Sequence, residues 1–220
     1  KGDRALMNLP ERVEIVEVAP RDGLQSQERH YSIETKLQML DLIADAGFKR
    51  IEVTGMVRPD VIPQLADGAE IFERLQRREG VTYRALAPNV KGAQRAIEVN
   101  ADEVLGLIVA SDTYNKKNAG MTVEENVEQL VKMAEVTRNA ETPMVVAIGC
   151  AMFCPYEGDI PAVRILGIIE RLVQEGLNSF YLAASVGLDN PRAAHDLTSQ
   201  IKDRWPSLVL GLHLHNTNGM

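Results

Sequence analysis

The chain has 220 residues, of which 45% are hydrophobic and 25% are charged, a composition that suits one large α/β domain with a substantial core. Its formal net charge of −7 argues against nucleic acid or an anionic membrane as a partner, so any phosphate-binding site must be local. No apolar run approaches the roughly 20 residues of a membrane span and no signal-peptide pattern begins the chain, so we expect a cytoplasmic protein.

Strand-like and helical patterns alternate along the chain. Apolar runs predict seven strands, at 13–18, 50–53, 81–86, 103–109, 143–151, 179–183 and 208–213. Helical periodicity and end signals predict helices at 33–46, 63–78, 92–99, 122–138 and 160–175, and one more that begins at Pro191. Thr122 and Glu125 have the spacing of a capping box at the start of one of these helices.

This alternation predicts parallel βαβ units, and seven of them exceed an ordinary doubly wound sheet. The predicted fold is therefore an α/β (βα)8 TIM barrel. Such a barrel typically needs about 250 residues and an eighth strand, so we expect its last strand and C-terminal segment to lie outside this chain.

One catalytic domain is predicted for residues 7–220, because no stretch rich in Pro, Gly or Ser divides them. Residues 1–6 precede Met7, which could be the initiator, and we interpret them as a processed start or a cloning remnant without function.

Two short motifs far apart in the sequence carry candidate metal ligands. Asp22 lies in the segment 19–23 after the first predicted strand, and His213 and His215 lie in the segment 212–216 at the last. Residues two apart on a strand point to the same face, so both imidazoles can reach one ion. A closed parallel barrel brings Asp22 to them, because its strands end on one rim.

Other interpretations of these motifs remain open. The first motif alone could be an ordinary charged turn, and the two histidines alone could be partly buried strand residues. Two histidines and a carboxylate also suit non-haem iron(II) oxygenases, although those usually have other scaffolds.

Five stretches of this chain occur in the order found in one enzyme family. They are Val16–Gln25, Ile51–Thr54, Val61–Asp67, Cys150–Gly158 and His213–Gly219. They resemble segments of the 3-hydroxy-3-methylglutaryl-CoA (HMG-CoA) lyases, within a larger group of metal-dependent barrel lyases and Claisen-type synthases. The segments Gln64–Asp67 and Cys154–Gly158 narrow the resemblance to the lyase branch.

The resemblance implies cleavage of HMG-CoA, or a close 3-hydroxyacyl-CoA, to acetyl-CoA and a β-keto acid such as acetoacetate by a retro-Claisen step. It implies a divalent cation, Mg²⁺ or Mn²⁺, held by Asp22, His213 and His215, which would activate and orient the substrate. Arg21 would stabilise the charge that develops on the enolate or thioester oxygen. Glu52 would support the ligand sphere or Arg21, the alternative being an ordinary solvent residue at a strand end. A homodimer is expected from the family alone.

Further substrate contacts are implied for Gln25, in the first motif, and for Lys116 and Lys117 in the basic segment 114–118. We expect this segment to be a loop on the catalytic rim, where its lysines could meet CoA phosphates or a substrate carboxylate. The alternative is a solvated loop that precedes a capped helix.

The chain departs from the lyase pattern at several places. Ala184 replaces an acidic residue expected near the acyl-CoA, and Asn216 replaces an aspartate. The family's catalytic Cys loop and an Asn metal ligand would fall beyond Met220. Two alternatives therefore stay open: a synthase that condenses acetyl-CoA with a 2-oxo acid, and a non-catalytic homologue that binds metal or acyl-CoA.

The remaining cysteines and histidines are not assigned to the site. Cys150 and Cys154 could form half a zinc site, but no second Cys pair follows, so we expect buried structural thiols. His30 and His195 are expected on the surface.

Overall fold

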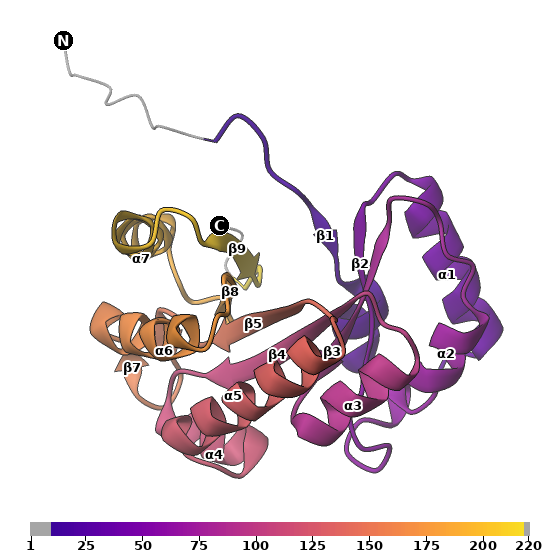
Figure 1. Ribbon diagram of the computed structural model, residues 1–220, viewed down its shortest axis with the longest axis horizontal. Helices are drawn as coiled ribbons and strands as arrows, with labels where there is room; N and C mark the ends of the chain where they lie inside the picture. Colours follow the sequence, from indigo (N-terminus) through magenta and orange to yellow (C-terminus); the bar gives the residue numbers. More distant parts are fainter. Residues whose placement is uncertain (1–9, 218–220) are drawn as a thin grey trace.

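A computed structural model describes residues 10–217. Within them, seven parallel strands form one sheet in the order β1-β2-β3-β4-β5-β8-β9. Their bounds are Val16–Glu17 (β1), Arg50–Gly55 (β2), Thr82–Ala87 (β3), Glu103–Val109 (β4), Met144–Gly149 (β5), Ser179–Ala184 (β8) and Val209–Leu214 (β9). Figure 1 shows this sheet curled into a half-barrel with β1 and β9 at its two edges. The predicted TIM-barrel class is confirmed in this TIM-barrel-like arrangement.

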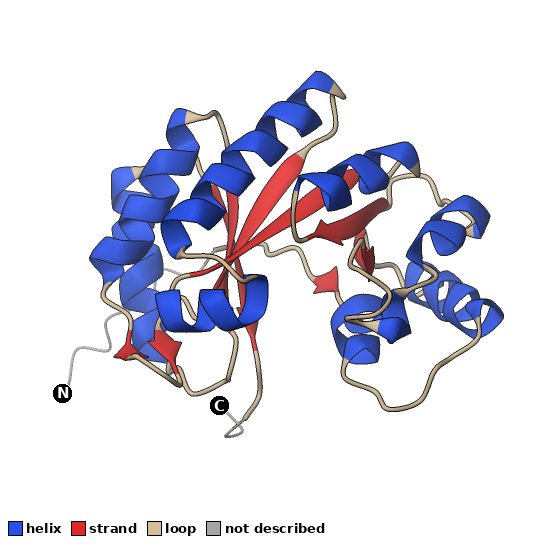
Figure 2. Ribbon diagram, turned by 90° about the horizontal axis from the view of Figure 1, so that it is seen from below, coloured by secondary structure: helices blue, strands red, loops and turns tan. Residues whose placement is uncertain are grey.

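The helices lie outside the curve of the sheet (Figure 2). They are Ile33–Asp45 (α1), Gly68–Arg74 (α2), Val90–Glu98 (α3), Asp112–Ala119 (α4), Val123–Asn139 (α5), Ala162–Gln174 (α6) and Pro191–Arg204 (α7). A short antiparallel hairpin, Phe153–Cys154 (β6) and Gly158–Asp159 (β7), was not predicted from the sequence. Among the described residues, none of these helices combines the length and the apolar character that a membrane crossing needs.

Local signals in the sequence determine where several helices begin. The side chains of Ser32, Asn89 and Asn190 each accept a hydrogen bond from a backbone N–H in the first turn of α1, α3 and α7. At α5 the predicted capping box is confirmed, since Thr122 accepts from the backbone of Glu125 and the Glu125 side chain accepts from Thr122. Such caps satisfy N–H groups that the helix itself leaves unpaired.

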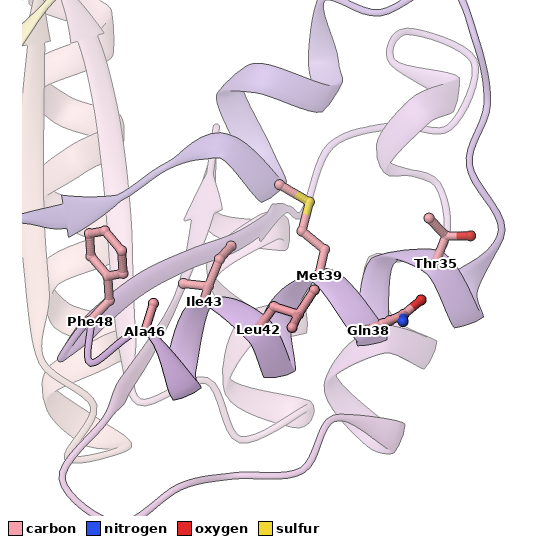
Figure 3. A pocket seen from close by; sticks show the side chains of 7 residues that line it. All are labelled: Thr35, Gln38, Met39, Leu42, Ile43, Ala46 and Phe48. Carbon is pink, nitrogen blue, oxygen red and sulfur yellow. The ribbon is translucent and has the colours of Figure 1, made fainter.

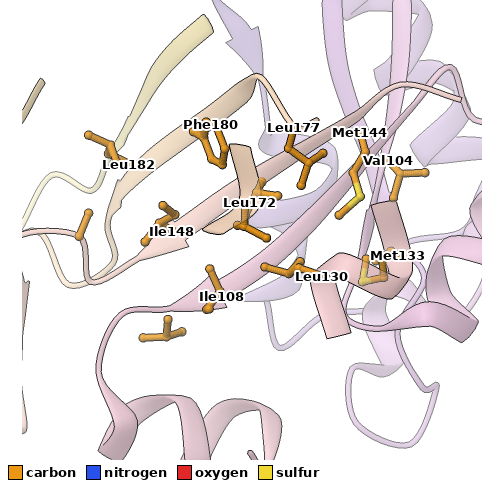
Figure 4. Packing of buried hydrophobic residues seen from close by; sticks show 14 of the residues in the cluster. Val104, Ile108, Leu130, Met133, Met144, Ile148, Leu172, Leu177, Phe180 and Leu182 are labelled. Carbon is orange, nitrogen blue, oxygen red and sulfur yellow. The ribbon is translucent and has the colours of Figure 1, made fainter. Parts of the chain in front are cut away.

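The main hydrophobic core lies between the sheet and the helices (Figure 4). On β4, Val104 and Ile108 belong to this core, whereas Leu105 belongs to a second, smaller cluster. Strand side chains alternate between two faces, so the smaller cluster lies on the opposite, inner face of the half-barrel. Gly106 allows close packing, because a Cβ there would lie 2.6 Å from Met144 and 2.7 Å from Leu130.

The predicted helix at 63–78 is wrong before Gly68 and after Arg74, the bounds of α2. The structure has a single 3-10 turn at Pro63–Leu65 (η2) before α2 begins at Gly68. Lys36 of α1 is 6% exposed, and its Nζ donates to the Gln64 carbonyl at 2.6 Å and to the Asp67 carboxylate at 2.7 Å. The Lys36 amine thus occupies the Gln64 carbonyl, which would accept a backbone hydrogen bond in a continuous helix. This tertiary contact overrides the helical periodicity of the sequence.

Two other elements differ from their predictions. The first strand is reduced to Val16–Glu17, because β1 pairs with β2 alone among the described strands and Val13 and Ile15 are exposed. The segment 114–118 is helical rather than a loop: Ser111 caps the N-terminus of α4, and Gly120 ends it in the left-handed conformation with φ 73°.

A shallow apolar cavity of about 420 Å³ lies on α1 (Figure 3). It is lined by Thr35, Gln38, Met39, Leu42, Ile43, Ala46 and Phe48. None of these residues was a candidate for catalysis or metal binding.

Candidate metal centre and active site

The structure brings the three predicted metal ligands together at the carboxyl ends of β1 and β9. The Nε2 atoms of His213 and His215 lie 3.0 Å apart, and Asp22 Oδ2 lies 3.6 Å and 3.8 Å from them respectively. One potential ligand atom from each residue falls within 4.8 Å of the others. The edges of the curved sheet therefore bring together residues from opposite ends of the sequence.

Asp22 is presented by an unusual turn. Ala19–Gly23 (η1) is a π-helical segment directly after β1, in which the Val18 carbonyl accepts from the backbone N–H groups of Asp22 at 2.7 Å and Arg21 at 3.1 Å. Single π-helical turns are rare and often occur at functional sites. This turn places two adjacent charged side chains, Arg21 and Asp22, on the lining of a second, larger cavity.

The segment that carries His215 is held by the loop after β8. Thr217 donates to the Val186 carbonyl at 2.7 Å. Gly187 has φ 63°, and a Cβ at this position would lie 2.3 Å from the His215 carbonyl oxygen. Glycine is required here both for the backbone conformation and for the close approach.

The surroundings of Asp22 favour its charged form. The pKa of the Asp22 carboxyl is lowered to about 2. The interaction with the His213 ring is the largest cause, and the charges of Arg21 and the two histidines add to it, whereas burial opposes the shift. Asp22 is therefore an anionic oxygen donor at neutral pH, as a ligand for a divalent cation must be.

Behind Asp22 lies a row of paired charges. Arg21 donates through Nε to Glu52 and through Nη1 to Asp22 at 2.7 Å. Arg84 Nη1 lies 3.9 Å from the second Glu52 oxygen, and Arg84 Nη2 lies 2.5 Å from Glu103. Glu52 and Arg84 are 1% and 2% exposed. Glu52 thus contacts Arg21, one of the two roles that the family resemblance implied.

Besides Arg21, three residues were predicted to contact substrate, and only one of them lines the cavity. Gln25 lines this large cavity, which covers the inner face of the half-barrel and continues past β9 to α7. Lys116 and Lys117 are exposed on α4 and are not among the lining residues, and the Lys117 ammonium lies 5.1 Å from the centroid of the Tyr156 ring. From the same helix, Tyr114 and Asn118 line the cavity instead.

This cavity of about 1650 Å³ also contains residues that the sequence did not single out. Arg84 and Tyr181 line it, with Leu107, Val109, Ala147, Gly149 and Ala183. The sequence could have pointed to Arg84, since it is the only charged residue in an otherwise apolar strand. Its partners Glu52 and Glu103 could not be predicted, because they are known only from the register of the neighbouring strands.

Ala184 lies away from the cavity. It is 2% exposed and belongs to the core between sheet and helices, while its neighbours Ala183 and Ser185 line the cavity. The missing acidic side chain at 184 therefore does not leave a gap in the lining of the cavity. Asn216 does line it, directly after His215.

The expectations for the cysteines and the other histidines are confirmed. Cys150 and Cys154 are free and buried, and Cys154 Sγ donates to Ser111 at 3.1 Å. Burial is the main cause that raises the pKa of the Cys150 thiol to about 12, so it is a poor nucleophile. His30 and the His195 side chain are exposed.

Comparison with known proteins identifies the family. The HMGL-like family model matches residues 12–220. A Pseudomonas aeruginosa protein named 3-hydroxy-3-isohexenylglutaryl-CoA/hydroxymethylglutaryl-CoA lyase is 34% identical over 213 residues, which cover 97% of this chain and 71% of that protein. The human mitochondrial hydroxymethylglutaryl-CoA lyase is 32% identical over 211 residues, with 96% and 65% covered.

Solved structures agree with this assignment. An HMG-CoA lyase from Acinetobacter baumannii, in complex with coenzyme A and 3-methylmalate, superposes with a TM-score of 0.89 at 32% identity, over 94% of this chain and 67% of that one. The present chain spans 65% and 71% of the length of the human and P. aeruginosa relatives. It belongs to the HMGL-like family, and the curated relatives that it matches are lyases.

Proposed function

We propose that this protein is a divalent-metal-dependent carbon–carbon lyase. Its substrate would be HMG-CoA or a close 3-hydroxyacyl-CoA, and its products acetyl-CoA and a β-keto acid. The observation that carries the proposal is the meeting of Asp22, His213 and His215 beside the Arg21–Glu52 pair. Membership of a family whose relatives are lyases supports it.

The donor set fits a divalent cation such as Mg²⁺ or Mn²⁺. One anionic carboxylate and two imidazoles are hard and borderline ligands, which suit first-row and alkaline-earth dications. The 3.0 Å between the two Nε2 atoms is compatible with adjacent ligands of one ion at about 2.1 Å each. When bound, such an ion would polarise the substrate hydroxyl and orient the substrate as a Lewis acid and template.

The residues of this chain have separate tasks in the cleavage. The tertiary hydroxyl loses its proton and becomes the ketone oxygen of the β-keto acid as the C2–C3 bond breaks. The electron pair of that bond passes to the thioester as the enolate of acetyl-CoA. The enolate takes up one proton at C2, which balances the proton lost from the hydroxyl. Arg21 would donate N–H groups to the thioester oxygen, where negative charge develops. Its contacts to Glu52 and Asp22 use Nε and Nη1, and a guanidinium has five donors, so N–H groups remain for the substrate.

Glu52 would orient Arg21. A buried guanidinium without a carboxylate partner is costly, so the pair holds Arg21 toward the cavity in one geometry. Gln25, which lines the same cavity, remains a proposed substrate contact. Lys116 and Lys117 keep at most a role at the entrance, with the phosphates of CoA, because they lie outside the lining.

An activity assay tests the proposal. The full-length protein is incubated with Mg²⁺ or Mn²⁺ and HMG-CoA, and acetyl-CoA and acetoacetate are measured, with a chelator added in a parallel sample. We expect metal-dependent release of both products. No release from HMG-CoA or from related 3-hydroxyacyl-CoAs rejects the lyase proposal.

The same preparation separates the two alternatives. Product formed from acetyl-CoA and a 2-oxo acid would favour a Claisen-type synthase. Tight binding of metal or acyl-CoA by calorimetry, without turnover in either direction, would favour a non-catalytic binding protein.

A further inference from the structure

Arg84 points into the half-barrel from β3. Its neighbours Tyr83 and Ala85 belong to the core between sheet and helices, whereas Arg84 lines the large cavity and is 2% exposed. Arginine stays charged in proteins, and a buried charge is costly unless it is paired. The reaction steps given above assign no task to this buried cation.

Strand register places Arg84 between two carboxylates. It is in register with Glu52 on β2 and with Glu103 on β4. Its Nη2 lies 2.5 Å from Glu103 and donates to the Tyr181 hydroxyl at 3.1 Å, while its Nη1 faces Glu52 Oε2 at 3.9 Å. Because Arg50 also contacts Glu103 at 2.8 Å, Glu103 does not use up the charge of Arg84.

The two oxygens of Glu52 have different partners. Oε1 accepts from Arg21 Nε, and Oε2 is the oxygen that faces Arg84. At 3.9 Å Arg84 and Glu52 attract each other without a direct hydrogen bond, and both are almost fully buried, so little water screens the attraction. Arg84 therefore favours the orientation of Glu52 in which its other oxygen meets Arg21.

Arg84 also supplies positive charge beside Arg21. Arg21 contacts two anions, Glu52 and Asp22, and one guanidinium cannot neutralise both. Two uncompensated carboxylates would weaken the positive potential that Arg21 presents to the cavity. Arg84 offsets the charge of Glu52, so more of the charge of Arg21 is available to an anion in the cavity.

We propose that Arg84 is a positioning residue, which fixes Glu52, offsets its charge, and thereby keeps Arg21 oriented and electropositive toward the enolate oxygen. The proposal rests on the lyase function above and deepens it by one residue. It predicts that the charge at position 84 matters more than the volume there, and that its effect passes through Glu52.

Three substitutions in the full-length protein separate charge from volume at position 84. Arg84→Gln and Arg84→Met remove the charge and keep a long side chain, whereas Arg84→Lys keeps the charge. For cleavage of HMG-CoA with Mg²⁺, we expect kcat to fall about tenfold or more in both neutral variants, because misplacing a catalytic group by about 1 Å can cost about 100-fold. KM should change by less than about threefold, because the oxyanion develops only in the transition state. Arg84→Lys should recover most of the lost kcat.

A double-mutant cycle tests the route through Glu52. Glu52→Gln removes the carboxylate that links the two arginines. When Arg84→Gln is added to Glu52→Gln, kcat should fall by less than about a further twofold, because the two changes interrupt the same contact. A full additional fall would show that Arg84 acts by another route and would overturn the proposal.

Arg77→Gln is the matched control. It removes an arginine that contacts Asp102 at 2.7 Å outside the cavity, with a side chain that is 36% exposed, and it should leave kcat unchanged. Urea denaturation shows whether each variant is folded, and Arg84→Met serves if Arg84→Gln does not fold. Native kcat in a folded neutral variant overturns the proposal, as does an Arg84→Lys protein that is no more active than Arg84→Gln.

Binding of S-carboxymethyl-CoA separates this inference from the lyase proposal. This thioether cannot be cleaved, and its carboxylate makes it an anionic analogue of the acetyl-CoA enolate. With saturating Mg²⁺ in every sample, we expect its calorimetric Kd to be about tenfold higher for Arg84→Gln than for the native protein and Arg84→Lys, because a weakened contact to a charged group costs about that much.

The two measurements together assign each failure. If nothing is cleaved but Kd follows this pattern, the lyase function fails and the role of Arg84 stands. If HMG-CoA is cleaved but neither kcat nor Kd changes in a folded neutral variant, the lyase function stands and the role of Arg84 is overturned. No cleavage and no binding by the native protein overturns both.

Discussion

Arg21 and Glu52 form an ion pair inside the half-barrel, where they are 9% and 1% exposed. Arg21 follows β1 and Glu52 lies on β2, so the pair joins the turn that presents Asp22 to the neighbouring strand. Arg84 stands on the other side of the same carboxylate at 3.9 Å. One buried carboxylate therefore faces two guanidinium groups.

Glu52→Ala should lower both stability and activity. Removing one partner of a buried ion pair leaves uncompensated charge, which costs about 3 kcal/mol or more in the free energy of unfolding. Loss of an oriented charge-stabilising group typically lowers kcat by about 10²–10³. Urea denaturation and steady-state kinetics measure the two effects. Glu34→Ala, which breaks an exposed pair with Arg74, is the control and should leave the free energy of unfolding nearly unchanged.

His213→Ala, His215→Ala and Asp22→Asn should each weaken metal binding. Each substitution removes one of three protein ligands, and we expect the Kd for Mn²⁺ to rise by about 100-fold or more. Calorimetric titration with Mn²⁺ reports this independently of catalysis. His30→Ala changes an exposed histidine outside the site and should bind Mn²⁺ like the native protein. Equal affinities in all four variants would show that the ion binds elsewhere.

Ala184→Asp should not create a better enzyme. The side chain at 184 faces the core between sheet and helices, so an aspartate there would bury an unpaired carboxylate. We expect a loss of about 3 kcal/mol in the free energy of unfolding and no gain in kcat. Ala184→Ser, a smaller change, is the comparison. A rise in kcat for Ala184→Asp would mean that this side chain reaches the substrate.

Glu157 should make stability depend on pH below neutrality. The backbone N–H of Thr113, which donates at 2.8 Å, is the largest influence that lowers the pKa of Glu157 from 4.5 to about 2, and Arg164 contributes as well. Because the folded pKa is the lower one, this stabilisation is present above pH 4.5 and is lost as pH falls toward 2. Glu157→Gln should cost about 1 kcal/mol at pH 7, discounted for solvent screening, and the difference from the native protein should shrink on acidification. A difference that is the same at every pH would contradict the assigned cause.

Cys150 and Cys154 should resist thiol reagents in the native protein. Both are buried, and the raised pKa of Cys150 leaves it as the neutral thiol at pH 8. In the described part of the chain, we expect no labelling by iodoacetamide before unfolding and labelling of both in urea. Cys150→Ser and Cys154→Ser identify the residue responsible if one reacts early.

Local patterns were sufficient for the elements whose sequence signals agree with their packing. The predicted strand 103–109 matches β4, and the capping box at Thr122 and Glu125 starts α5 as expected. The prediction failed at Gln64 and Asp67, where the amine of Lys36 from another helix breaks the periodicity. It also failed at α4, because the loop-like residues at 114–118 are held by a Ser111 cap.

Spacing and residue type in the sequence alone predict a parallel βα protein and a carboxylate–histidine set, because strand periodicity and ligand chemistry are local properties. The distances among Asp22, His213 and His215, the Glu52 contact to Arg21, and the hydrogen bond from Arg84 to Tyr181 depend on the curvature and register of the sheet. Register is set by packing between strands that are distant in the sequence, so no local pattern contains it.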